Sequence, residues 1–265
     1  MVSDIDRRFV ASIAEVYQRL LVPLIFEPYA VHIADRVARL RPARVLEIAC
    51  GTGVATRELA SRTTASIVAT DLNQAMLDQA NAAGTSRPVE WRIADAMKLP
   101  FDDGTFDVVA CQFGVMFFPD KAKAFAEARR VLRSGGAFVF SAWDRLEENE
   151  FADAVTDALT QIAADGPRSF VARTPHGYYD IDVIAADLAR GGFDRKPEFE
   201  TIAERSRAAS PSIPAIAYCQ GTPLRNEIET HLPEATELAT AEVARRFGTG
   251  PVDGKIQAHL VSIQR

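Results

Sequence analysis

The chain has 265 residues, of which 48% are hydrophobic and 25% charged, a composition typical of a globular protein with a substantial core. Its formal net charge of −6, without any basic run, argues against broad binding to a nucleic-acid backbone. Charged residues interrupt every stretch that could span a membrane, and the charged first residues lack the apolar region of a secretory leader. We therefore expect a cytoplasmic protein without a membrane span.

The cysteines show no pattern of a metal site. Cys50, Cys111 and Cys219 are far apart in sequence and lack metal-ligand spacing. Cys50 and Cys111 lie in apolar surroundings, where a small buried thiol is common. No other cluster of histidine, cysteine and carboxylate residues has ligand spacing, so we expect no metal.

The chain begins with a helical pattern over residues 3–40. Apolar residues recur at helical spacing, and Pro23 and Pro28 divide the pattern into pieces, the second of which covers residues 29–40. Tyr17 and Phe26 are the residues of this region that could reach a pocket. Packing of both rings against the core is an equally good explanation for aromatics in an amphipathic helix.

The chain is organised around residues 44–56, RVLEIACGTGVAT. Bulky apolar residues predict a short buried strand, small residues at positions 49, 51 and 53 predict a tight turn, and a helix follows. Gly51 and Gly53 permit positive φ and close approach of a ligand, and the helix N-terminus offers unpaired N–H groups. An ordinary βα turn would need the same glycines. The dinucleotide fingerprint is not matched, because Thr56 stands at its third glycine, and no phosphate-binding loop is present.

The next strand, over residues 66–70, ends at Asp71. This acid follows Gly53 by 18 residues, close to the offset at which a βαβ unit presents a carboxylate to a ribose. Leu72 and Met76 follow and could form an apolar wall for an adenine. Asp71 could instead be the N-cap of a helix over residues 74–83. The position after the glycine turn favours ribose binding.

The rest of the chain alternates strands with helices and then gains a helical insertion. Strands are predicted over residues 89–94, 106–111, 137–142, 199–206 and 256–263. Helices are predicted over residues 121–132, 150–165 and 181–190 and within 214–247, with a turn at 133–136 and a loop at 167–179. Open α/β sheets bind ligands at the carboxyl edge of their strands, where Gln112 and Phe113 would also lie.

Three segments resemble the class I S-adenosylmethionine-dependent methyltransferases. The first is the acid-x-small-x-Gly-x-Gly pattern that begins at Glu47, in which Ala49 replaces the glycine most common in that family. The others are ADAMKLPFDDGTFDVV and RRVLRSGGAFVFSAWD, which are similar to the small-molecule branch that includes ubiquinone and menaquinone biosynthetic enzymes. The resemblance covers residues 44–144. It is specific for fold and cofactor and says less about the methyl acceptor.

This resemblance implies an α/β fold with a Rossmann-like seven-stranded methyltransferase sheet, mostly parallel with an antiparallel edge strand. Residues 1–43 would form N-terminal helices that cover the cofactor. Residues 44–265 would form the methyltransferase domain, with helical cap insertions at about 145–178 and 208–250.

The resemblance also implies S-adenosylmethionine as the methyl donor and S-adenosylhomocysteine as the product. By the family match, the Asp95 carboxylate would accept from the adenine amine and the Ala96 N–H would donate to a ring nitrogen. The cofactor-binding residues implied by the motifs are Tyr17, Glu47, Ala49, Cys50, Gly51, Gly53, Asp71, Leu72, Met76, Asp95, Ala96, Gln112 and Phe113.

The implied reaction is an in-line SN2 transfer to an O, N, S or C atom of a small, fairly apolar or aromatic acceptor. His176 is the candidate catalytic base if the acceptor must lose a proton, although it could equally brace its own loop. The candidate walls of the substrate pocket are Met116, Phe117, Trp143, Arg173, Tyr178 and Tyr179.

Two other functions remain open from the sequence. One is a nicotinamide-dependent oxidoreductase, which the missing third glycine disfavours. The other is a methyltransferase fold kept as a non-catalytic binding module, which the intact acid and glycine motifs disfavour. The expected partner is a small-molecule methyl acceptor rather than a nucleic acid. The sequence determines neither its identity nor the oligomeric state.

Overall fold

The computed structural model of this protein describes residues 11–162, 170–228 and 234–265. The start of the predicted N-terminal helix and the end of the helix predicted at 150–165 lie outside these ranges. No helix in the described ranges is long and apolar enough to cross a membrane.

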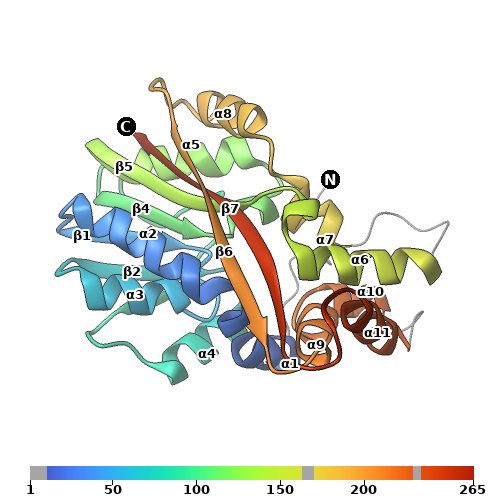
Figure 1. Ribbon diagram of the computed structural model, residues 1–265. Coiled ribbons are helices and arrows are strands. Elements are labelled where there is room, and N and C mark those ends of the chain that lie inside the picture. The colour runs from blue at the N-terminus through green and yellow to red at the C-terminus, as the bar shows by residue number, and fades with distance from the viewer. Residues whose placement is uncertain (1–10, 163–169, 229–233) are drawn as a thin grey trace.

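A seven-stranded sheet forms the centre of the molecule, in the order β3-β2-β1-β4-β5-β7-β6 (Figure 1). The strands are β1 (Arg44–Ile48), β2 (Ser66–Asp71), β3 (Glu90–Ile93), β4 (Phe106–Gln112), β5 (Leu132–Trp143), β6 (Glu198–Ala208) and β7 (Val252–Gln264). Strands β1 to β5 run parallel to one another, and β7 pairs antiparallel with both β5 and β6. The predicted seven-stranded, mostly parallel sheet with an antiparallel hairpin at one edge is therefore confirmed.

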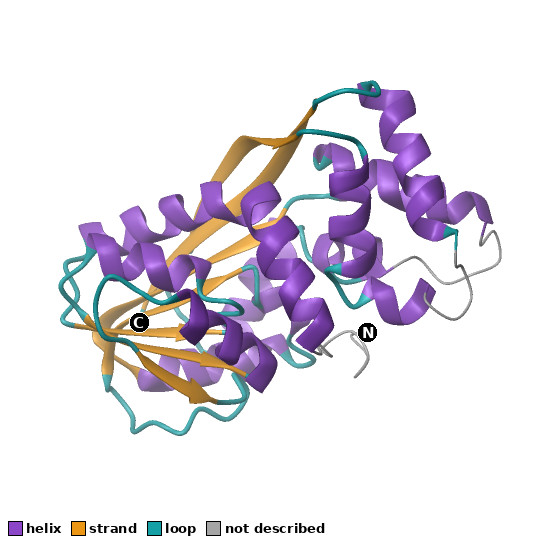
Figure 2. Ribbon diagram, turned by 90° about the horizontal axis from the view of Figure 1, so that it is seen from below, coloured by secondary structure: helices purple, strands orange, loops and turns teal. Residues whose placement is uncertain are grey.

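Helices cover both faces of this sheet (Figure 2), which explains the nearly continuous apolar runs of the central strands. One face carries α2 (Glu27–Arg39), α3 (Val54–Arg62) and α4 (Gln74–Ala83), and the other carries α5 (Lys121–Val131) and α8 (Ile181–Arg190). The large buried rings Phe106, Phe125, Phe138 and Phe140 belong to this core.

The N-terminal segment contains α1 (Ala11–Val16) and a π-helix, η2 (Tyr17–Phe26). The sequence predicts a break at Pro23, yet the helix passes through this residue. Proline lacks the N–H of an α-helical ladder, and the chain adopts a wider helical turn here, in which the Glu27 N–H bonds the Val22 carbonyl five residues earlier. This widened helix places Tyr17 and Phe26 at the edge of a pocket.

The remaining helices gather beyond the carboxyl ends of the parallel strands (Figure 1). They come from both predicted insertions: α6 (Glu150–Ile162), α7 (Phe170–Arg173), α9 (Ser212–Gln220), α10 (Leu224–Ile228) and α11 (Ala235–Phe247). Helix α11 packs against α6 and α9, and α7 packs against α10, so the two insertions form one group. We call these five helices the helical group.

Short 3-10 turns connect several elements: η3 (Val115–Phe117), η4 (Leu146–Glu148) and η5 (Pro175–Gly177). The predicted loop at 167–179 thus contains α7 and η5. The turn predicted at 133–136 lies inside β5, where Gly135 adopts a φ of 76°. Strands β6 and β7 are longer than predicted because their pairing continues from Glu198 opposite Ser262 to Ala208 opposite Val252.

Candidate functional site

The turn after β1 contains three residues with positive φ at alternate positions. These are Ala49, Gly51 and Gly53, with φ of 52°, 56° and 78°. Alanine at position 49 is costly in this left-handed conformation and brings a methyl group to a place where the family commonly has glycine. The structure compensates at Gly114, where a Cβ would lie 2.5 Å from the Ala49 Cβ. The absence of a side chain at 114 therefore makes room for Ala49.

Asp71 holds this turn against the end of β2. Its Oδ2 accepts from the Gly51 N–H at 2.9 Å, and its Oδ1 accepts from the Asn73 N–H at 2.8 Å. Burial raises the pKa of Asp71, and these hydrogen bonds oppose that shift by favouring the carboxylate. The residue before α4 is Asn73, so Asp71 is not the N-cap of that helix. Its carboxylate faces the pocket, as the ribose hypothesis requires.

Glu47 presents an acceptor without a partner. The side chain is buried on β1, where its Oε2 accepts from the Thr56 hydroxyl at 2.6 Å and its Oε1 has no hydrogen bond with any described residue. Burial raises the pKa of this carboxyl to about 8. Gln112, at the end of β4, presents a second acceptor of this kind. Its Nε2 donates to the Phe26 carbonyl at 2.8 Å, and its Oε1 is buried and has no partner among the described residues. Both residues line the pocket.

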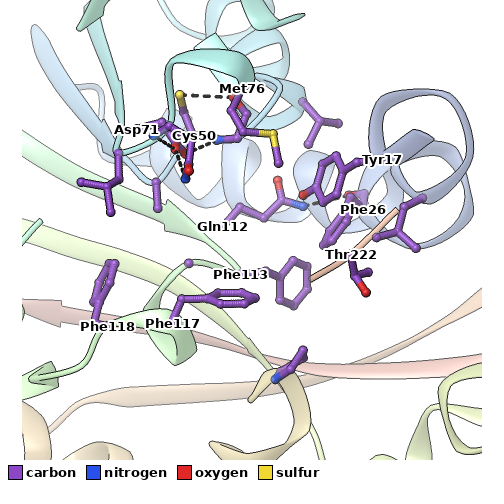
Figure 3. A pocket seen from close by; sticks show the side chains of 18 of the residues that line it. Tyr17, Phe26, Cys50, Asp71, Met76, Gln112, Phe113, Phe117, Phe118 and Thr222 are labelled. Carbon is purple, nitrogen blue, oxygen red and sulfur yellow. Dashed lines mark hydrogen bonds between the residues drawn. The ribbon is translucent and has the colours of Figure 1, made fainter. Parts of the chain in front are cut away.

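Aromatic rings form the other side of the pocket (Figure 3). Phe113 stacks on Trp143, with ring centroids 3.8 Å apart and an interplanar angle of 7°. Phe26 lies 5.6 Å from Phe113 and 5.1 Å from Tyr17, centroid to centroid. Phe113 itself adopts a φ of 53°, a conformation that bulky residues rarely hold without support from surrounding packing. The stack thus fixes a flat apolar wall beside the Asp71 turn.

His176 lies in η5, is 4% exposed and lines the same pocket. Its Nδ1 is 2.9 Å from the Asp144 carbonyl oxygen. Because a carbonyl can only accept, Nδ1 carries the proton and the neutral ring keeps a lone pair on Nε2. Burial lowers the pKa of His176 to about 4, although the Asp144 carbonyl and the charges of Asp144 and Glu147 oppose this shift. The imidazole is therefore neutral at physiological pH, and its Nε2 has no partner among the described residues.

Most of the predicted site residues come together in this one pocket. Those that line it are Tyr17, Glu47, Ala49, Cys50, Gly51, Asp71, Leu72, Met76, Asp95, Ala96, Gln112, Phe113, Phe117, Trp143 and His176. Burial raises the pKa of the Cys50 thiol, so this cysteine is a protonated, unreactive part of the wall. The Asp95 Oδ1 accepts from the Met97 N–H at 2.8 Å, which orients the carboxylate after β3.

Five predicted residues do not line the pocket. Gly53 instead packs toward Trp91, whose ring would lie 2.9 Å from a Cβ at this position, and Met116 is buried in the core. Arg173 pairs with Glu227 at 2.6 Å. The Tyr178 hydroxyl donates to Asp187 at 2.8 Å, and Tyr179 is 43% exposed.

The pocket also contains residues that the sequence analysis missed, three of which belong to the helical group. Phe170 and Val171 come from α7 and Tyr218 from α9. Other missed residues of the wall are Leu21, Ile25, Asn73, Pro175 and Thr222. Tyr218 and Thr222 belong to a segment, residues 217–223, that carries no recognisable motif. Only the folded contacts between α7, α9 and the sheet edge identify them.

Comparison with known proteins identifies a methyltransferase domain in this chain. Residues 46–140 match the family model described as a methyltransferase domain. The malonyl-[acyl-carrier protein] O-methyltransferase of Geobacter sulfurreducens is 34% identical over 178 residues, which are 66% of this chain and 64% of that protein. The demethylmenaquinone methyltransferase of Mycolicibacterium gilvum is 36% identical over 64% of this chain and 69% of its own length. The match to the Geobacter protein thus spans less than two thirds of that relative.

The fold agrees as well. A solved structure of Haemonchus contortus Phospholethanolamine N-methyltransferase 2, in complex with phosphomonomethylethanolamine and S-adenosylhomocysteine, superposes with a TM-score of 0.62 at 15% identity. That superposition covers 99% of this chain and 61% of the other. The chain belongs to the S-adenosylmethionine-dependent methyltransferase family.

Proposed function

We propose that this protein transfers the methyl group of S-adenosylmethionine by in-line displacement to a small, neutral, apolar or aromatic acceptor. The observation that carries this proposal is the asymmetry of the pocket. Glu47, Asp71 and Asp95 lie along its glycine-turn side, and aromatic rings form the opposite side. Among the described residues, no lysine or arginine lines it. An anionic acceptor would find no charged partner here, and its desolvation would go uncompensated.

The residues of the turn side fit the methyl donor. Vicinal ribose hydroxyls donate hydrogen bonds, and Asp71 is the carboxylate that faces them at the end of β2. The unpaired Oε1 atoms of Glu47 and Gln112 fit hydrogen-bond donors such as the ammonium group of a methionine. Asp95 and Ala96 would hold the adenine, with Leu72 and Met76 as its apolar walls.

The donor supplies a methyl group on a sulfonium, which is already activated for displacement, so the protein contributes mainly orientation and proton handling. The Phe113–Trp143 stack would orient a flat acceptor and exclude water. His176 would accept a hydrogen bond from an acceptor hydroxyl at Nε2 and take its proton as the new bond forms. Its low pKa keeps the lone pair available at every pH above about 5, and the same shift makes the imidazole a weak base, so its position beside the acceptor hydroxyl would carry the role.

We also propose that residues 1–43 and the helical group cover the two ends of this pocket. Tyr17 and Phe26 line it from the N-terminal segment, and Phe170, His176 and Tyr218 line it from the insertions. Both segments would have to open for ligands to enter. The acceptor would then be a free small molecule of the cytoplasm.

The names of the related proteins cover different acceptors, which makes the chemistry of the pocket the better guide. One relative is named for demethylmenaquinone and another for malonyl-[acyl-carrier protein], and the Haemonchus structure contains phosphomonomethylethanolamine. The aromatic stack and the lack of cationic lining residues favour a neutral ring compound over a phosphate or a carboxylate.

A methyl-transfer assay with isotopically labelled S-adenosylmethionine tests this proposal. The panel should contain neutral phenols and quinols together with phosphoethanolamine and a malonyl thioester. We expect label only in the neutral ring compounds. Transfer only to the anionic compounds would refute the acceptor class, and failure to bind S-adenosylhomocysteine would refute the whole proposal. The Tyr179→Phe variant is a matched control, because this exposed ring lies outside the pocket.

A further inference from the structure

Tyr218 is a buried residue whose hydroxyl has no hydrogen-bond partner in the part of the chain that the structure describes. The residue lies on α9, is 5% exposed and lines the pocket. Its hydroxyl forms no hydrogen bond with any described residue. Burial raises the pKa of Tyr218, so the phenol stays protonated and can donate. Buried tyrosine hydroxyls normally find a partner, and this one has open pocket space instead.

Two other buried tyrosines show that this fold otherwise satisfies such groups. The Tyr29 hydroxyl donates to the Ile202 carbonyl at 3.0 Å, and the Tyr178 hydroxyl donates to Asp187 at 2.8 Å. Neither residue lines the pocket. Of these three tyrosines, only Tyr218 lines the pocket, and only its hydroxyl has no hydrogen bond with the described residues.

Neighbouring contacts hold Tyr218 in place. The Thr222 hydroxyl donates to the Tyr218 carbonyl at 2.7 Å, and the Gly221 N–H bonds the carbonyl of Ala217 at 3.0 Å. A side chain at Gly221 would lie 2.6 Å from that same carbonyl and 3.3 Å from the Tyr17 backbone nitrogen. The glycine therefore lets the end of α9 pack closely against η2, and this packing fixes the position of Tyr218 relative to η2.

Tyr218 complements His176 across the helical group. The two residues come from different insertions and line the same pocket, and each has one unsatisfied polar atom. The phenol offers a hydrogen-bond donor. The imidazole Nε2 offers an acceptor, because Nδ1 already donates to Asp144. A ligand that satisfies both atoms needs one hydroxyl and one oxygen acceptor on an otherwise apolar frame.

We infer that Tyr218 determines acceptor specificity by donating a hydrogen bond to a carbonyl or ether oxygen of the methyl acceptor. This inference rests on the proposed function and narrows its substrate class to neutral hydroxylated rings that carry a second oxygen. His176 engages the hydroxyl that is methylated, and Tyr218 engages the other oxygen. A ring without that oxygen would leave the Tyr218 donor unpaired, which disfavours it.

Binding of paired probes to the full chain, saturated with S-adenosylhomocysteine, tests this role by calorimetry. The probes are 1-tetralone and tetralin, which share one bicyclic frame and differ by the carbonyl oxygen. A neutral hydrogen bond of this kind corresponds to roughly three- to tenfold in affinity, so we expect the wild type to prefer 1-tetralone by about that factor. The Tyr218→Phe variant should lose the preference and bind tetralin as the wild type does.

Controls separate recognition from packing. Tyr179→Phe should keep the full preference. Tyr218→Phe should keep the thermal stability of the wild type, because no internal hydrogen bond is lost, whereas Tyr178→Phe should melt at a lower temperature. Preserved 1-tetralone preference in Tyr218→Phe, or an equal loss for both probes, would overturn the inference.

Two further outcomes are decisive. If neither probe binds although S-adenosylhomocysteine does, the inferred substrate class is wrong while cofactor binding stands. If S-adenosylhomocysteine itself does not bind, the proposed function fails and this inference fails with it.

Discussion

The two sides of the pocket are built by different means. The turn side comes from short loops that follow β1, β2 and β3, where backbone conformation and carboxylates dominate. Ala49, Gly51 and Gly53 have positive φ, and Asp71 accepts a hydrogen bond from the Gly51 N–H. The aromatic side comes from the end of β5, the widened helix η2 and the helical group, and there ring packing dominates. Under the proposed function, local backbone geometry would hold the methyl donor and tertiary packing would hold the acceptor.

The electrostatics of the two sides differ in the same way. The turn side contains Glu47, whose pKa burial raises to about 8, and unpaired oxygen acceptors. The aromatic side contains a neutral imidazole and a protonated phenol, each with one polar atom that has no partner among the described residues. The carboxyl groups therefore lie on the turn side only. We therefore expect mutations on the turn side to change mainly cofactor affinity and mutations on the aromatic side to change mainly turnover.

The largest expected effect is that of His176→Gln on turnover. The variant cannot take up a proton, so we expect kcat for a hydroxylated acceptor to fall by at least about 100-fold, the lower end of general-base contributions. The dissociation constant of S-adenosylhomocysteine should stay within about twofold, because His176 lies among aromatic and helical-group residues. Single-turnover kinetics measures the rate of methyl transfer, and calorimetry measures the dissociation constant of S-adenosylhomocysteine. Unchanged kcat would assign His176 to bracing its loop through Asp144.

Asp71→Ala should have the opposite effect, because it should weaken cofactor binding. The substitution removes the acceptor of the Gly51 and Asn73 N–H groups and the carboxylate that faces the ribose. We expect S-adenosylhomocysteine to bind about 100-fold more weakly, since hydrogen bonds to a charged group contribute ~1.5–3 kcal/mol each. Calorimetric titration measures this loss. Asp78→Ala is the control, because Asp78 is exposed on α4 and accepts only from Gln74; equal weakening by both variants would contradict the role of Asp71.

The sheet and the turn side were largely predictable from sequence because their signals are local. Apolar runs gave the order of strands and helices, and the spacing from Gly53 to Asp71 predicted a carboxylate at the sheet edge, where the structure has it. The predicted pocket residues that the structure places elsewhere are positioned by distant packing. Tyr178 and Arg173 lie next to His176 in sequence, yet Asp187 and Glu227 draw their polar groups away from the pocket.

The converse holds for residues that were missed. Tyr218 belongs to a segment without a motif, and it reaches the pocket only because α9 packs against η2 and α11. Ala49 was correctly noted as a departure from the family pattern. Its compensation by Gly114, 65 positions later, requires the folded contact between the ends of β1 and β4. The sequence therefore indicated pocket residues whose place follows from local backbone position, and it did not indicate those whose place depends on tertiary contact.

Gly53→Ala should lower stability, with a smaller effect on binding. The residue has a φ of 78°, and a Cβ there would lie 2.9 Å from Trp91 and 3.1 Å from Ala80. Left-handed strain and overpacking each cost about 1–3 kcal/mol, so we expect a loss of about 2–6 kcal/mol in the free energy of unfolding. Chemical denaturation measures it. Gly135→Ala shares the positive φ but meets open space, and it should lose only the strain contribution. Equal losses would show that the contact with Trp91 is unimportant.

Glu47→Gln should cause the smallest change in cofactor affinity, about tenfold or less. This variant is informative because it should change how stability and binding depend on pH. The folded pKa is about 8 against an ordinary value of 4.5, so the native state retains a proton that the unfolded state loses. Wild-type stability should therefore fall as the pH rises from about 4.5 to about 8 and then level off. Glutamine resembles the protonated carboxyl, so the variant should lack this slope and be the more stable protein at pH 8.

Binding should respond in the opposite sense. The ammonium group of S-adenosylhomocysteine favours the ionised Glu47, so wild-type binding should release a proton below about pH 8 and strengthen as the pH rises toward that value. Glu47→Gln should bind more weakly, without the proton release attributable to Glu47. Calorimetry in buffers of different ionisation enthalpy counts the protons, with Glu58→Gln, on the outward part of α3, as the control. The same proton release in both variants would show that Glu47 does not touch the ligand, and the turn side would then hold the methionine end through Gln112 alone.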